Sequence, residues 1–178
     1  QFAERLKNKA IKDAAIAAKS LKEAMSQMAL KQQEATNSAR DLKIAQAGFQ
    51  LAQTKVIAAT KLYEEASVKA ARSQEEASKA RHELKDAALN HAILAKADRL
   101  EKNSKKDLDV RDSALASKTR SELSLMDFKE RLEIADKTAA AASAEITEMA
   151  KRVIEKTELA NMAGAAEKLA RQRTAPVS

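Results

Sequence analysis

Residues 45–66 read AQAGFQLAQTKVIAATKLYEEA, and alanine recurs in them at every seventh position. The alanines of this repeat are Ala45, Ala52, Ala59 and Ala66. Three residues before each alanine stands a larger apolar or aromatic side chain: Leu42, Phe49, Val56 and Tyr63. Apolar residues at alternating spacings of three and four lie on one side of an α-helix. The stretch therefore predicts a helix whose contact stripe is half alanine.

The same repeat extends far beyond these residues. If position a of the heptad is placed at Ala14, it recurs at every seventh residue as far as His91. Position d then runs from Ala17 to Leu94, and eight of its twelve residues are Ala. A strict seven-residue repeat predicts a left-handed coiled coil, because a straight helix of 3.6 residues per turn would drift away from its contact line. We call the a and d positions the seam, and we expect one continuous helix over residues 1–100.

A second heptad register follows, out of phase with the first. Its a positions are Leu125, Leu132, Ala139, Ile146, Val153 and Ala160, and its d positions are Phe128, Ala135, Ala142, Met149, Lys156 and Ala163. Between the registers, residues 101–107 are all polar, with Asn103 and Ser104 at their centre. Such a segment predicts a connection between helices. We therefore expect a second helix over 108–170 and a frayed tail over 171–178, which contains Pro176.

The predicted fold class is all-α: a long alanine-rich coiled coil that forms an extended helical hairpin or a bundle. Because the first helix is longer than the second, either part of its seam needs a partner from another chain or the first helix bends. The partner would be a second copy or a related coiled-coil chain. The residues expected at the helix–helix interface are Leu21, Ala24, Leu42, Ala45, Phe49, Ala52, Val56, Ala59, Tyr63, Ala66, Ala80, Leu84, Ala87, Leu94, Leu125, Phe128, Leu132, Ala135, Ala142, Ile146, Met149 and Val153.

Alanine in the seam has a gain and a cost. Small side chains let helix axes approach more closely than the spacing that leucines impose, which brings more backbone atoms into contact. Burying an alanine, however, contributes less free energy than the ~1.5–3 kcal/mol gained by burying a Leu or Val. A seam of this kind is weak in each heptad and needs length or additional helices.

Besides His91, four seam positions of these registers are polar: Lys31, Ser38, Ser73 and Lys156. Two interpretations stay open for them. The lysine stems can pass along the seam and hold their amines in water. Alternatively, polar seam residues set the register and orientation of the helices at some cost in stability.

The residues that would carry chemistry are sparse and scattered. The chain has no cysteine, and His82 and His91 are nine residues apart, on different faces of a helix. Adjacent carboxylates such as Glu64-Glu65 and Glu75-Glu76 diverge on a helix, whereas acid–base catalysis needs convergent groups. With no glycine-rich phosphate loop or zinc-ligand spacing, we expect no enzyme activity, no metal and no cofactor.

The net charge of +7 comes from 33 basic and 26 acidic residues that interleave along the chain. Nucleic-acid binding instead calls for basic residues gathered on one face with aromatic side chains nearby, so we expect no nucleic-acid partner. No run of 18 apolar residues is present, which predicts no transmembrane segment. The basic excess favours weak attraction to an acidic membrane surface.

The pattern resembles the coiled-coil silk fibroins of insects such as bees, ants and mantises. The likeness lies in the repeated alanines, in the Ser, Lys and Glu exterior, and in the near absence of Gly, Pro and Cys; the alanines are Ala17, Ala24, Ala45, Ala52, Ala59, Ala66, Ala80 and Ala87. The 33% of charged residues departs from it. The resemblance implies a secreted, self-assembling structural protein. Two other functions use similar helices: the coiled-coil arm or spacer of a bacterial adhesin, toxin or translocator, and an exchangeable lipid-binding helical bundle.

Overall fold

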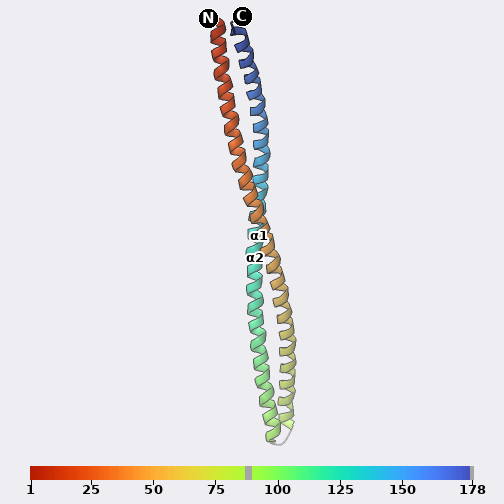
Figure 1. The fold of residues 1–178 in the computed structure, drawn as a ribbon. Coiled ribbons are helices and arrows are strands. Elements are labelled where there is room, and N and C mark those ends of the chain that lie inside the picture. Colours follow the sequence, from red (N-terminus) through yellow and green to blue (C-terminus); the bar gives the residue numbers. More distant parts are fainter. Residues whose placement is uncertain (87–89, 177–178) are drawn as a thin grey trace. The chain divides into compact units, whose positions relative to one another are not determined.

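A computed structural model describes residues 1–86 and 90–176, which form two long α-helices and no strand. Helix α1 spans Phe2–Asp86 and helix α2 spans His91–Thr174 (Figure 1). This confirms the all-α fold class. The chain divides into two compact units, which we treat separately: unit 1 comprises residues 1–43 and 134–178, and unit 2 comprises residues 44–133.

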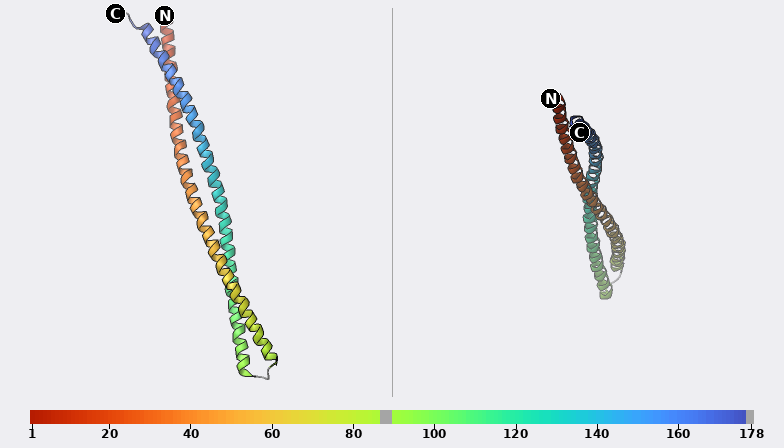
Figure 2. Two further views of the ribbon diagram at one scale, coloured as in Figure 1. Left: turned by 90° about the vertical axis from the view of Figure 1, so that its right-hand side faces the viewer. Right: turned by 45° about the horizontal axis from the view of Figure 1, so that its top comes forward.

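Each unit is an antiparallel pair of helix segments. Unit 1 pairs the first half of α1 with the second half of α2, so that both chain termini lie at one end of it (Figures 1 and 2). Unit 2 pairs the remaining halves as a helical hairpin. Neither helix contains, within the described residues, a stretch long and apolar enough to cross a bilayer.

The helices begin and end where local chemistry favours it. At the start of α2, the side-chain oxygen of Asn90 accepts a hydrogen bond from the backbone N–H of Ala92 at 3.0 Å, as an N-cap residue does. The last turn of α2 carries Arg171 and Arg173, whose charge is favourable at the negative end of the helix dipole. Pro176 follows the end of the helix.

The predicted connection at 101–107 is wrong, and so are the predicted helix bounds of 1–100 and 108–170. Residues 101–107 lie inside α2, and the break between helices lies between Asp86 and His91. The two helices have nearly equal lengths of 85 and 84 residues, so the first has no surplus seam. Three polar side chains of this segment lie in the interior of unit 2 or bind across it: Ser104 is buried, and Glu101 and Asp107 both bind residues of α1. The predicted tail also starts too early, because α2 continues to Thr174.

The second register likewise extends over the whole of α2, from Ile93 to Thr174, and every seam position in it is buried or half-buried. The same holds in α1 from Lys7 to Leu84. Most of the fully buried side chains are alanines, and Ala70 and Ala97 have no exposed surface at all. The core of unit 2 is therefore a thin line of small side chains between two helices. In unit 1 the buried side chains among the described residues are Ala24 and Met149.

Candidate functional site

The candidate site is the seam itself. All of the predicted interface residues are buried or half-buried except two. Leu94 belongs to α2, where its neighbour Ile93 takes the seam position and leaves Leu94 37% exposed. Its assignment to the first helix was wrong, because the register shifts by one residue between Leu84 and Ile93. Ala87 lies outside the described residues.

Contacts across each helix pair give its alignment. In unit 2, the Lys118 amine lies 5.2 Å from the centre of the Tyr63 ring, and Phe128 lies against Gly48. In unit 1, Lys31 binds Glu145. In both units, residue n of α1 thus lies close to residue 177 − n of α2, to within about a turn. With this alignment, each a position of one helix stands opposite a d position of the other.

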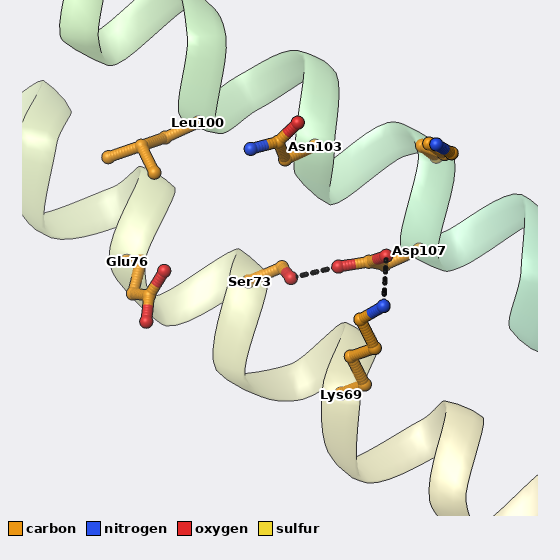
Figure 3. A pocket seen from close by; sticks show the side chains of 7 residues that line it. Lys69, Ser73, Glu76, Leu100, Asn103 and Asp107 are labelled. Atoms are coloured by element: carbon orange, nitrogen blue, oxygen red, sulfur yellow. Dashed lines mark hydrogen bonds and ion pairs between the residues drawn. The ribbon is translucent and has the colours of Figure 1, made fainter.

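A polar cluster interrupts the apolar seam of unit 2 (Figure 3). The Ser73 hydroxyl donates a hydrogen bond to Asp107, and the Lys69 amine lies 3.7 Å from the other carboxylate oxygen of Asp107. The Asp107 side chain is only 12% exposed. A carboxylate this far from water is costly unless it keeps its partners. The cluster supports the interpretation that polar seam residues favour one register, because a slip would separate Asp107 from Ser73 and Lys69.

The second polar contact of unit 2 lies near the break between the helices. Arg81 of α1 binds the carboxylate of Glu101 in a two-pronged contact, and its guanidinium also lies 3.3 Å from Asp98. The hydrogen bond from Arg81 lowers the pKa of the Glu101 carboxyl below its ordinary value of 4.5, and the same bond raises the pKa of Arg81. These are exposed side chains, so they orient the helix pair more than they stabilise it.

The Arg81–Glu101 contact predicts an acid sensitivity. Because the folded state lowers the pKa of Glu101, the contact adds stability at pH values above 4.5, and this stability disappears as the pH falls through the lower, folded-state pKa. We expect Glu101→Gln to lower the melting temperature near neutral pH and to match the parent in strong acid. Glu64, which forms no ion pair with any described residue, supplies the Glu64→Gln control. A melting-temperature difference between parent and Glu101→Gln that does not shrink in acid would contradict the prediction.

In unit 1 the amine of the seam residue Lys31 binds two carboxylates instead of extending into water alone. Its amine lies 3.0 Å from Glu145 of α2 and 3.1 Å from Glu34 of its own helix. The hydrogen bonds to Glu145 and then to Glu34 raise the pKa of Lys31. Lys156 is half-buried and lines a groove on unit 1.

A glycine–aromatic contact cannot be read from the heptad pattern, which places Phe49 and Phe128 in the seam but not Gly48. A Cβ atom at position 48 would lie 2.7 Å from the Phe128 ring. The absent side chain therefore makes the space that the ring occupies. Gly164, by contrast, has nothing within 4 Å of such a Cβ. The signal in the sequence was a glycine next to the seam residue Phe49, but its partner becomes visible only when the helices are aligned.

The residues considered for chemistry stay apart. His82 and His91 are both exposed. Among residues 1–86 and 90–176, no three His, Asp or Glu side chains gather as a metal ion would require. The arrangement that the structure does bring together is a ladder of helix–helix contacts.

Comparison with known proteins returned no match to a protein-family model, to a curated protein or to a solved structure.

Proposed function

We propose that this chain is a structural coiled-coil protein that self-associates into bundles or fibres. The observation that carries the proposal is the amount of apolar surface left uncovered. Twenty large apolar side chains are exposed among the described residues, whereas the best-buried side chains are nearly all alanines. Each unit by itself is only two helices thick, so no further layer within the unit covers these larger side chains.

The composition of the seam supports the same proposal, because its alanines bury little apolar surface in each heptad. Self-association is the route by which an all-helical chain with a thin alanine seam gains the burial that the seam does not supply.

The proposal includes the silk-like form of this function, in which the protein is secreted and extracellular. The alanine repeat is the feature that supports this form. An adhesin, toxin or translocator arm would use the same seam, but it would present its exposed apolar residues to a different chain. A lipid-binding bundle would instead open its seam onto a bilayer.

The proposal predicts that stability depends on protein concentration. Because association stabilises only the folded chain, the melting temperature followed by circular dichroism should rise over a hundredfold increase in concentration. A melting temperature independent of concentration would contradict self-association. Flotation with acidic vesicles is the parallel test: a chain that floats with lipid and shows no concentration dependence would favour the lipid-binding function.

A further inference from the structure

The heptad repeat leaves three alignments of α1 and α2 open in unit 2. In the observed one, residue n of α1 lies close to residue 177 − n of α2. A slip of one heptad in either direction again sets each a position opposite a d position. Residue n then faces residue 170 − n in what we call the lower alignment, and residue 184 − n in the higher alignment. Contacts other than the repeat must therefore select among the three.

Charge disfavours the higher alignment. A slip in that direction would move Asp107 away from Lys69 and beside Glu76, so that two carboxylates meet. It would also bring Arg81 beside Lys105. Like charges in contact repel, and the observed ion pairs are lost at the same time. The higher alignment therefore does not compete with the observed one.

The lower alignment, in contrast, fits the seam of unit 2. Every seam pair of this alignment within the unit contains an Ala or a Ser, except Tyr63 opposite Asp107. Val56, for example, would face Ala114. A small residue opposite each large one lets the two helices keep their close spacing. The side chains of the seam therefore give no reason of size for the observed alignment over the lower one.

Asp107 distinguishes the two alignments (Figure 3). Its carboxylate is only 12% exposed and is bound by the Ser73 hydroxyl and the Lys69 amine. In the lower alignment, the residues that take their places are Leu62 and Ala66, whose side chains donate no hydrogen bond. A carboxylate this far from water is costly when it loses its partners. The lower alignment is therefore penalised at this position.

Two further carboxylates of α2 are displaced by the same slip. Glu101 binds Arg81 in unit 2, and Glu145 lies 3.0 Å from the Lys31 amine in unit 1. Because α1 and α2 are each continuous, a slip of one heptad separates both pairs. The residues that would replace the two basic partners, seven positions earlier in α1, are Gln74 and Ala24. Neither carries a charge, so both ion pairs would be lost without replacement.

We propose that these three carboxylates of α2, Glu101, Asp107 and Glu145, hold the two helices in the observed alignment against a slip of one heptad into the lower one. The alanine seam brings the helices together, and the carboxylates select their alignment. Without the carboxylates, α2 is free to move along α1 by about 10 Å, the length of one heptad. This inference concerns the pairing of α1 with α2 within one chain and is independent of the proposed self-association.

Disulfide trapping reports the alignment, since the chain has no cysteine of its own. Val56→Cys with Ser121→Cys places two cysteines opposite each other in the observed alignment, and Val56→Cys with Ala114→Cys does so in the lower one. A pair that is one heptad out of alignment is about 10 Å apart along the helices, beyond the ~7 Å between Cα atoms that a disulfide spans. Bonds within one chain are counted in the monomer band of a gel run without reducing agent.

The test variant of the full chain combines Glu101→Ala, Asp107→Ala and Glu145→Ala. In the parent, only the Val56–Ser121 pair should oxidise. In the test variant, the fraction of the Val56–Ala114 pair that oxidises should rise about tenfold, the factor that corresponds to one hydrogen bond to a charged group.

The matched control removes three carboxylates of α2 from its outermost f positions and so changes the net charge equally. Its substitutions are Asp109→Ala, Glu130→Ala and Glu158→Ala, and none of these exposed residues forms an ion pair with any described residue. The control should behave as the parent. Circular dichroism confirms that each variant is helical. If the triple test variant is not helical, the three single variants, each of which keeps two of the carboxylates, should each raise the Val56–Ala114 fraction.

The outcomes are distinct. A rise of the Val56–Ala114 fraction in the helical test variant and not in the control supports the proposal. A helical test variant that oxidises only the Val56–Ser121 pair overturns it, because the helices then keep their alignment without the carboxylates. Equal oxidation of the Val56–Ala114 pair in test variant and control, or in the parent, overturns it as well.

Discussion

Replacing Ala70 by leucine is expected to destabilise the helix pair of unit 2 by about 1–3 kcal/mol, the cost of forcing extra methylenes into a packed core. Ala70 is completely buried in the seam. It lies between Lys69 and Ser73, the two residues that bind Asp107. A leucine there has no space without separating the helices, and separation breaks the polar cluster as well.

The neighbouring alanine supplies the control. Ala71 is exposed, so Ala71→Leu adds the same atoms to solvent and should change stability by no more than about 0.5 kcal/mol. Urea unfolding of both variants measures the two free energies of unfolding. If both leucines had the same effect, the seam would not require alanine, and the account of close helix approach would fail.

The second large effect is expected at Phe128. Phe128→Ala removes a half-buried aromatic ring from the seam of unit 2, and we expect a loss of about 2 kcal/mol, below the 3–5 kcal/mol of a fully buried ring. The ring lies against Gly48. The effect of a change at Gly48 must therefore depend on whether the ring is present.

A double-mutant cycle measures this dependence. With Phe128 in place, Gly48→Ala should destabilise, because the new Cβ would lie within 3 Å of the ring and the ring must move. With alanine at 128, Gly48→Ala should stabilise by up to about 1 kcal/mol through helix propensity. Gly164→Ala, which meets no neighbour, should stabilise in both backgrounds. A Gly48→Ala effect of the same sign with and without the ring would show that the contact is unimportant.

The seven-residue repeat predicted most of the fold. It correctly marked the burial of residues as far apart as Leu21 and Val153, because in a two-helix layer the contact side is set by the repeat alone. It also showed two registers out of phase. The shift falls between Leu84 and Ile93, at the break between the helices.

The position of that break was missed because the seam of α2 is polar over several heptads. Ser104, Asp107, Arg111 and Lys118 all occupy seam positions, and a search for apolar residues passes over them. Asp107 and Lys118 have partners on α1 that make them acceptable there, and those partners are known only once the helices are aligned. Asn90 was the local signal for the start of α2.

The groove of unit 1 could not be predicted from the sequence for the same reason. Ile16 and Leu159 are isolated apolar residues in their own helices. They border one groove only because α1 and α2 run antiparallel at this alignment.

Sedimentation equilibrium of the unmodified chain tests self-association without assuming the shape of the particle, since it measures the mass. Self-association predicts a mass of at least twice 19.4 kDa that increases with concentration. A single species of 19.4 kDa at the highest concentration would contradict self-association and the proposed structural function with it.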